Sequence, residues 1–220
     1  MKSRPSPNAV ESEKMQRANK KEEQRISSVD RIMKCALDLF VTNGYRATTV
    51  EMIGVRAKLT KGAIYFYFKS KEAILLRLLE DAETIVVNPV FALADDTNSP
   101  ALDRLVGFLN QQSNVALSHP HHLLLLILMS VEFYGTNTEI EERVRTIYRR
   151  LYTYIDGLIR HGQTEGGIRT DIRSHELTAV VMAQHDGTLI EWYRRPGELE
   201  GKNMARVARL TLLDGLKARS

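Results

Sequence analysis

The chain has very little cysteine: Cys35 is the only one in its 220 residues. A single thiol excludes an intramolecular disulfide and any metal cluster held by several cysteines. Long apolar runs are lacking too, since the longest uninterrupted one, Leu123 to Met129, is far too short to span a bilayer. The polar N-terminus offers no apolar region of the kind a signal peptide needs. We therefore expect a soluble cytoplasmic protein with no membrane partner.

Signatures of common enzyme sites are also missing. The sequence contains no Gly-rich phosphate loop, no nucleophile elbow and no metal signature. Three histidines lie between residues 119 and 122, but no carboxylate or cysteine stands at ligand spacing nearby. His185 followed by Asp186 is compatible with a catalytic pair or a metal site, although a buried, hydrogen-bonded histidine is favoured. We expect no catalytic residues, no metal and no cofactor.

Charge is unevenly distributed along the chain. Residues 1–80 hold 16 Lys and Arg against 9 Asp and Glu, a net charge of +7, whereas residues 81–220 hold 15 against 18, a net charge of −3. An excess of positive charge in one part of a chain is expected where phosphate contacts supply affinity. The N-terminal part is therefore the candidate for nucleic-acid binding.

Alternating strand patterns and internal repeats are absent, and apolar residues recur at helical spacing from Val29 onward. Beyond residue 100 the expected helices cover residues 101–117, 121–134, 138–162, 174–195 and 203–217. The segment 121–134 is apolar on nearly all sides, which predicts a buried central helix. The sequence predicts an all-α protein.

The most informative stretch is residues 48–75, TTVEMIGVRAKLTKGAIYFYFKSKEAIL. Thr48 and Glu51 fit a capping box, Thr60 is a good N-cap for a second helix, and Ser70 begins a third. Two short helices joined by a tight turn, the second basic at its start and rich in aromatics, are typical of a helix-turn-helix. This pattern indicates DNA binding.

The segment from Arg31 to Leu79 resembles the DNA-binding domain of the TetR family of transcriptional regulators. The landmarks that carry the resemblance are Ala36-Leu37-Asp38-Leu39-Phe40, Asn43-Gly44-Tyr45, Thr48-Thr49-Val50, Thr60-Lys61-Gly62-Ala63-Ile64-Tyr65, Phe68 and Ser70-Lys71-Glu72. Lys58 departs from the pattern where a glycine in left-handed conformation is usual, at a cost of about 1 kcal/mol. Tyr67 departs where histidine is most frequent.

The resemblance implies a set of DNA contacts on these helices. The residues expected to bind DNA are Thr48, Thr49, Thr60, Lys61, Gly62, Ala63, Tyr65, Phe66, Tyr67 and Lys71. Gly62 and Ala63 are small enough for the second helix to lie deep in the major groove. Lys61 reaches guanine edges or a phosphate, and Tyr65 and Tyr67 donate hydroxyls to phosphates.

The remaining contacts would position the protein on the DNA backbone. Lys71 and its helix N-terminus are expected to hold a phosphate, with Thr48 and Thr49 at the opposite edge. Alternatives stay open: Tyr65 could be core packing, and Lys61 and Lys71 could be ordinary solvated charges. Basic residues within 1–25 could form an arm for phosphates or the minor groove, although a solvated tail is favoured because four glutamates dilute the charge.

The resemblance also implies a domain organisation and an effector. We expect a disordered or marginally helical basic extension over 1–25, a helix-turn-helix domain over 26–70, and a larger helical effector-binding and dimerisation domain over 71–220. Helices between residues 101 and 162 would enclose a pocket for a hydrophobic or amphipathic small molecule, such as an acyl chain, an acyl thioester or an aromatic compound. Candidate lining residues are Phe108, Gln112, His122, Leu126, Met129, Phe133, Tyr148 and Tyr152, each of which could equally be plain core.

The last two helices of this family pack against their copies in a second subunit. Candidate interface residues are Val181, His185, Gly187, Thr188, Trp192, Thr211 and Gly215. The resulting expectation is a homodimeric regulator, by family default a repressor, that binds a near-palindromic double-stranded operator and releases it when the effector binds. A constitutive or architectural DNA-binding protein without an effector is the alternative.

Overall fold

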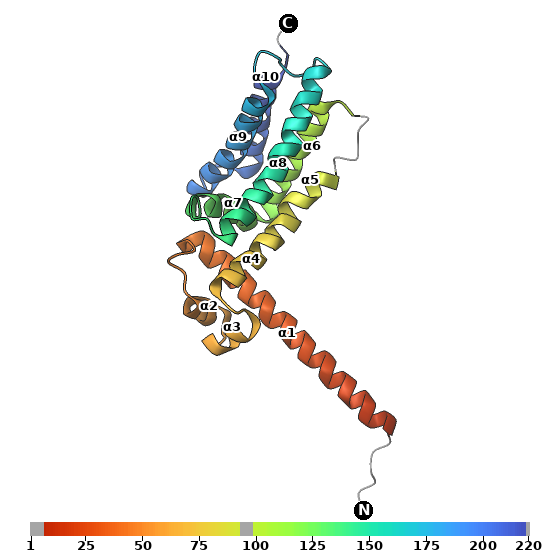
Figure 1. The fold of residues 1–220 in the computed structure, drawn as a ribbon, viewed down its shortest axis with the longest axis vertical. Helices are drawn as coiled ribbons and strands as arrows, with labels where there is room; N and C mark the ends of the chain where they lie inside the picture. The colour runs from red at the N-terminus through yellow and green to blue at the C-terminus, as the bar shows by residue number, and fades with distance from the viewer. Residues whose placement is uncertain (1–6, 93–98, 219–220) are drawn as a thin grey trace, which may run out of the picture. The chain divides into compact units, whose positions relative to one another are not determined.

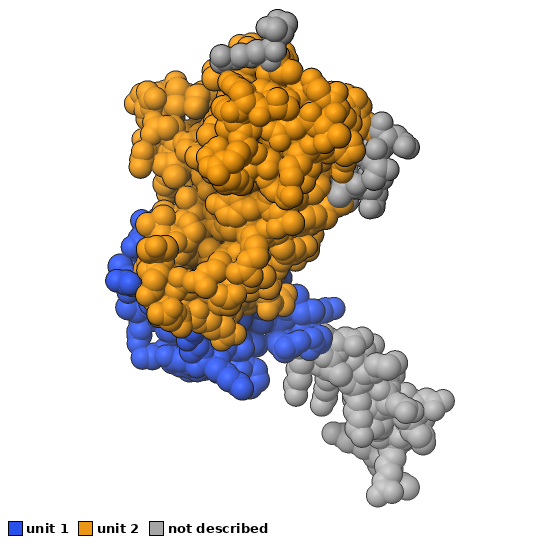
Figure 2. Space-filling model, turned by 45° about the horizontal axis from the view of Figure 1, so that its top comes forward, with its two compact units in different colours: residues 1–74 blue, residues 75–220 orange. Residues whose placement is uncertain are grey.

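The computed structural model describes the backbone of residues 7–92 and 99–218, and side chains over residues 22–91 and 99–218. Every named element within those ranges is a helix, and none is a strand (Figure 1). The all-α fold expected from the sequence is confirmed. The chain divides into two compact units, residues 1–74 and 75–220 (Figure 2).

The division between the units lies inside a helix. Unit 1 contains the helices α1 (Pro7–Asn43), α2 (Val50–Ala57), α3 (Lys61–Tyr67) and the beginning of α4 (Lys71–Ala82). Unit 2 contains the end of α4, the π-helical turn η1 (Glu83–Val87), and the helices α5 (Asn88–Ala92), α6 (Ala101–Ser118), α7 (Pro120–Glu132), α8 (Glu139–Thr164), α9 (Ser174–Arg194) and α10 (Gly201–Leu216).

Helix α1 is longer than its apolar pattern suggests. The apolar stripe begins at Val29, whereas the helix begins at Pro7, so much of the stretch expected to be disordered or marginally helical is helix. The side chains of the basic residues before position 22, which were considered as an arm, lie outside the described residues. The buried side chains of Ile32 and Phe40 on α1 join Ile53 of α2 and Ile64 of α3 in the core of unit 1.

The turn between α2 and α3 has the conformation that the sequence predicts. Lys58 ends α2 in the left-handed region, with φ 56° and ψ 44°, which confirms the expected departure from glycine. A Cβ added at Gly54 would lie 2.9 Å from the Leu59 carbonyl oxygen, so glycine there lets the chain fold back tightly. Thr60 caps α3 by accepting a hydrogen bond from the Ala63 N–H at 3.1 Å.

One predicted cap was wrong by a residue. The N-cap of α2 is Thr49, whose hydroxyl accepts from the Met52 N–H at 3.2 Å, and not Thr48. Thr48 is fully buried, and its hydroxyl lies within hydrogen-bond distance of the carbonyl oxygens of Leu39 (3.2 Å) and Gly44 (2.8 Å). These internal acceptors leave the Thr48 side chain no role as a cap.

The helical path that begins with α4 is not stopped by Pro89, although the sequence pattern predicted that it would be. After α4 the helix changes to the π turn η1 and continues directly into α5, where Pro89 occupies the first turn. Proline is tolerated at the start of a helix because it has no N–H to donate there. The result is one helical path from Lys71 to Ala92 with a single turn of different pitch. Such turns often occur at functional positions.

Four helices of unit 2, namely α6, α8, α9 and α10, form a bundle with its core between them (Figure 1). Helix α7 turns through 104° from the axis of α6. Its leucines are buried, as predicted for a helix that is apolar on all sides. No single helix among the described residues is long and apolar enough to cross a membrane, and only the bent pair α6–α7 meets that test by length and composition.

Candidate DNA-reading face and effector cavity

Helix α3 turns one face inward and leaves the other in solvent. Ile64 is fully buried and anchors the helix, whereas Phe66 is 80% exposed and Tyr65 45% exposed. Lys61 and Gly62 at the start of the helix are exposed as well. An exposed helix face with a cation, a glycine and two aromatic rings suits a polyanion and the edges of bases.

Lys61 has a partner in the free protein. Its ammonium forms an ion pair with the Glu51 carboxylate of α2, and both side chains are about half exposed. The hydrogen bond between them raises the pKa of Lys61 and lowers the pKa of Glu51. Because the pair is open to water, a DNA phosphate can take the place of Glu51 at little cost.

The other expected DNA contacts differ in accessibility. Thr49 and Thr60 are exposed, and Ala63 and Tyr67 are partly exposed, so all four side chains can be reached from outside. Thr48 is fully buried, so a phosphate contact by its side chain is wrong for this conformation.

Lys71 does not point its ammonium outward either. Its Nζ donates to the carbonyl oxygens of Tyr45 at 2.7 Å and Thr48 at 2.8 Å, and lies 4.1 Å from the centre of the Tyr45 ring. These contacts connect the start of α4 to the loop between α1 and α2. The structure therefore gives this ammonium an internal role where the sequence predicted a phosphate ligand.

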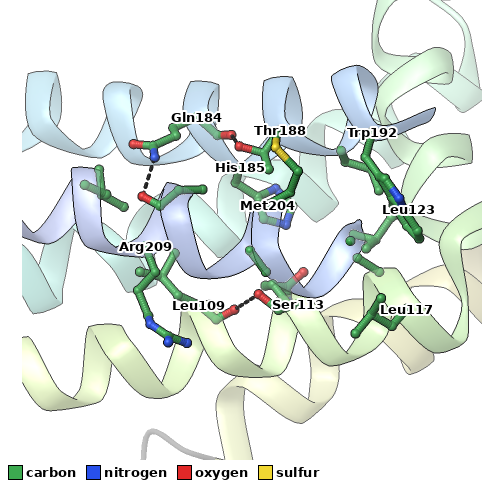
Figure 3. Close-up of a pocket in the computed structure, with 17 residues that line it drawn as sticks. Leu109, Ser113, Leu117, Leu123, Gln184, His185, Thr188, Trp192, Met204 and Arg209 are labelled. Atoms are coloured by element: carbon green, nitrogen blue, oxygen red, sulfur yellow. Dashed lines mark hydrogen bonds between the residues drawn. The ribbon is translucent and has the colours of Figure 1, made fainter. Parts of the chain in front are cut away.

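Unit 2 contains a partly open cavity bounded by α6, α7, α9 and α10. Figure 3 shows Gln184, His185, Thr188 and Trp192 of α9 facing it from one side and Leu109, Ser113 and Leu117 of α6 from the other. The other lining residues are Gln112, Ala116, Leu123, Leu189, Gly201, Met204, Ala205, Ala208, Arg209 and Leu212. A mostly apolar wall with a few polar groups is typical of a small-molecule site.

Two polar groups at this cavity are held by specific partners. The Gln112 side-chain amide donates to the Val86 carbonyl oxygen of η1 at 2.9 Å. His185 Nδ1 lies 2.8 Å from the Asp186 carboxylate, which also accepts from the Tyr148 hydroxyl at 3.3 Å. Burial raises the pKa of Tyr148, and the nearby Asp186 raises it further.

Most of the predicted lining residues lie outside this cavity. Of the predicted lining residues, only Gln112 lies in its wall, because α9 and α10 complete it and not α8. Met129, Tyr148 and Tyr152 instead line a second groove between α7, α8 and α9.

The other predicted lining residues lie elsewhere in the fold. Phe108, Leu126 and Phe133 are buried core residues. His122, at the start of α7, is partly exposed, and its burial together with the charges of the neighbouring histidines lowers its pKa to about 4. No group of three or more potential ligands that could hold a metal ion occurs in the described part of the chain.

The predicted dimer residues separate into two sets. Val181 is fully buried, and His185, Thr188 and Trp192 face the cavity, so these four belong to the interior of unit 2. They recur on one helical face, and that face covers the protein's own core.

The other predicted interface positions are open. Gly187, Thr211 and Gly215 are exposed or partly exposed, and a Cβ added at either glycine would meet nothing within 4 Å. Sequence reasoning missed Ser113, Met204 and Arg209 of the cavity, since nothing in the local pattern distinguishes lining residues from core residues.

Comparison with known proteins agrees with this geometry. Residues 32–78 match the family described as "Bacterial regulatory proteins, tetR family", and residues 134–217 match "BetI-type transcriptional repressor, C-terminal". The crystal structure of the MbdR regulator from Azoarcus sp. CIB is 53% identical, covers 86% of this chain and 98% of its own, and superposes with a TM-score of 0.80.

More distant proteins share the fold over most of the chain. The uncharacterized HTH-type transcriptional regulator YhgD of Bacillus subtilis is 27% identical over 207 residues, covering 87% of this chain and 99% of its own length. The regulator FadR from Bacillus subtilis, solved in complex with stearoyl-CoA, is 20% identical, with a TM-score of 0.64 over 84% of this chain and 97% of its own. These relatives are DNA-binding transcriptional regulators and not enzymes. The chain belongs to the TetR family of transcriptional regulators.

Proposed function

We propose that the protein is a cytoplasmic repressor that binds a near-palindromic operator as a dimer and releases it when a small molecule enters the cavity of unit 2. The exposed face of α3 supports DNA reading through Lys61, Gly62, Tyr65 and Phe66. The observation that favours a ligand-responsive regulator over a constitutive DNA-binding protein is the apolar cavity beside Gln112.

The dimer would form through the outer faces of α9 and α10. Val180 of α9 and Val207 and Leu210 of α10 are each about half exposed, which is unusual for such side chains on neighbouring helices. Gly187 on α9 leaves room for the close approach of a second helix. A twofold pair of chains presents two α3 helices to two half-sites of one operator.

The signal would travel along the helical path from Lys71 to Ala92. In unit 1, Lys71 holds the carbonyl oxygens of Tyr45 and Thr48. In unit 2, the Glu83 carboxylate of η1 is paired with Arg143 and Arg150 of α8, while Gln112 of the cavity wall donates to Val86 of the same turn. A ligand that favours another conformer of this π turn would move α4 and change the spacing of the recognition helices.

The effector would be a hydrophobic or amphipathic molecule. The cavity is walled mainly by aliphatic side chains and the Trp192 ring, and its wall includes the cationic Arg209. A relative of the same fold has been crystallised with stearoyl-CoA, a molecule with a long apolar part and an anionic part. Acyl compounds and aromatic compounds are therefore the first classes to test.

Selection of source-genome DNA fragments by the purified protein, with excess random competitor at near-physiological salt, tests the proposal. A few sites that share an inverted repeat would support a dimeric, sequence-specific regulator, and neighbouring genes would indicate the chemistry of the effector. Bound fragments without a shared motif would contradict the operator proposal. Specific sites whose occupancy does not respond to any acyl or aromatic compound would favour the constitutive alternative.

A further inference from the structure

The amide of Gln112 is an unusual group in the wall of the cavity. The residue is only 2% exposed, and its nitrogen donates to the Val86 carbonyl oxygen at 2.9 Å. Because a backbone carbonyl can only accept, the nitrogen must face Val86, and this settles the orientation of the amide. The other amide atom, Oε1, is buried and has no hydrogen-bond partner among the described residues. A buried acceptor without a partner is unfavourable and is uncommon in folded proteins.

Neighbouring polar groups present acceptors as well. The Ser113 hydroxyl donates to the Leu109 carbonyl at 2.7 Å, and the Thr188 hydroxyl donates to the Gln184 carbonyl at 2.6 Å (Figure 3). Each hydroxyl has one hydrogen, so only lone pairs remain for a ligand.

His185 adds a further acceptor when its ring is uncharged. Its Nδ1 faces the Asp186 carboxylate at 2.8 Å, and a carboxylate only accepts, so Nδ1 holds the hydrogen. In the uncharged ring, Nε2 is then an acceptor. A ligand that also brings only acceptors would leave Gln112 Oε1 and these neighbouring groups unmatched.

We propose that the effector carries a hydrogen-bond donor, a hydroxyl or an amide N–H, on an otherwise apolar body, and that this donor is buried against Gln112 Oε1. This inference rests on the proposed function, because it assigns chemistry to the same cavity. The apolar body would lie against Leu109, Ala116, Leu123, Leu189 and Met204. An ether, ester or carboxylate oxygen at Gln112 would place acceptor against acceptor, so ligands of those kinds bind there weakly.

The chain contains a built-in reporter for this test. Trp192 is its only tryptophan and lies in the cavity wall, so tryptophan emission responds to occupancy of this cavity. The probes are octanol and heptyl methyl ether, which are isomers with the same number of carbons and one oxygen. Only the alcohol donates a hydrogen bond. We expect the full-length protein to bind octanol about tenfold more tightly than the ether.

Two matched variants locate the effect. Gln112→Leu removes the amide oxygen at similar volume, and we expect it to bind the two isomers equally. Gln111→Leu makes the same change one residue earlier on α6, outside the cavity wall, and is expected to retain the preference for octanol. If Gln112→Leu does not fold, the affinities of the natural protein for the two isomers still test the donor proposal.

The possible failures are distinguishable. Equal binding of the isomers by the natural protein, or an unchanged preference in Gln112→Leu, would overturn the donor proposal and leave the effector cavity in place. Equal binding is also the result expected if a buried water, and not the ligand, satisfies Gln112. No change in Trp192 emission or in thermal stability with either isomer would overturn the cavity as an effector site, and the donor proposal with it.

Discussion

The two units differ in where their polar side chains lie: those of the candidate site in unit 1 face solvent, and those in unit 2 face a cavity. In unit 1, Lys61 and Tyr65 stand in solvent on α3, and the one ion pair that engages Lys61 is itself open to water. In unit 2, Gln112, Ser113 and Thr188 face a cavity and already donate to backbone carbonyls. A surface that reads a polyanion needs exchangeable partners, whereas a pocket for a small molecule needs fixed ones.

The largest effect is expected from removing two exposed side chains of α3. The double change Lys61→Ala and Tyr65→Ala should weaken specific operator binding roughly a hundredfold, since each contact contributes about 1–3 kcal/mol. Thermal stability and the response of Trp192 to octanol should be unchanged, because both groups lie on the surface of unit 1. Fluorescence anisotropy with labelled operator measures the loss.

The matched control changes exposed residues of the same kinds in unit 2. Arg149→Ala with Tyr134→Ala removes a cation and a tyrosine from its surface and should leave operator affinity unchanged. Retained operator affinity in the Lys61 and Tyr65 double variant would contradict the assignment of α3 as the DNA-recognition helix.

The second prediction tests whether the outer face of unit 2 forms the proposed dimer interface. Leu210→Glu places a charge on the proposed α10 interface, and desolvating that charge should shift the dimer to monomer and weaken operator binding by tenfold or more. Sedimentation velocity measures the oligomeric state. Val131→Glu, at a position 74% exposed on α7, is the control and should remain a dimer. A dimeric Leu210→Glu protein would remove α10 from the interface.

A smaller effect compares two helical glycines, one in each unit. Gly54→Ala brings a Cβ to 2.9 Å from the Leu59 carbonyl oxygen and should lower the free energy of unfolding by about 1–3 kcal/mol. Gly157→Ala in α8 meets nothing within 4 Å and should raise it by about 0.5–1 kcal/mol. Urea unfolding measures both. Equal effects of the two changes would show that the tight turn after α2 does not depend on glycine.

The smallest effect concerns pH. Burial lowers the pKa of His122 to about 4 from an ordinary value of 6.5, so the unfolded chain binds a proton first as pH falls. The stabilising contribution of the neutral ring is therefore complete above pH 6.5 and is lost as pH falls toward 4. His122→Gln should lose less stability than the natural protein across this window. We expect a difference of no more than about 1 kcal/mol, because the ring is partly screened by solvent. Parallel stability curves from pH 7 to 4 would contradict the depressed pKa.

Sequence patterns predicted unit 1 well because its signals are local. Thr60 lies next to the amides that it caps, and Lys58 occupies a backbone conformation set by its own turn. The errors arose where a side chain met a distant segment. Lys71 donates to carbonyls more than twenty residues earlier in the chain, and Thr48 donates to Leu39. Neither contact has a signature in neighbouring residues.

In unit 2, helical spacing correctly grouped Val181, His185, Thr188 and Trp192 on one face of α9, but it could not indicate what that face covers. An apolar stripe specifies only that it is buried, and a second subunit, the protein's own core and a cavity wall all satisfy it. The sequence by itself determined the helices, the helix-turn-helix and the family, since these depend on spacing, caps and short-range sterics. Only the tertiary structure decided which stripe lines the cavity and which side chains of unit 1 stay accessible to DNA. Those outcomes depend on contacts between segments far apart in the chain.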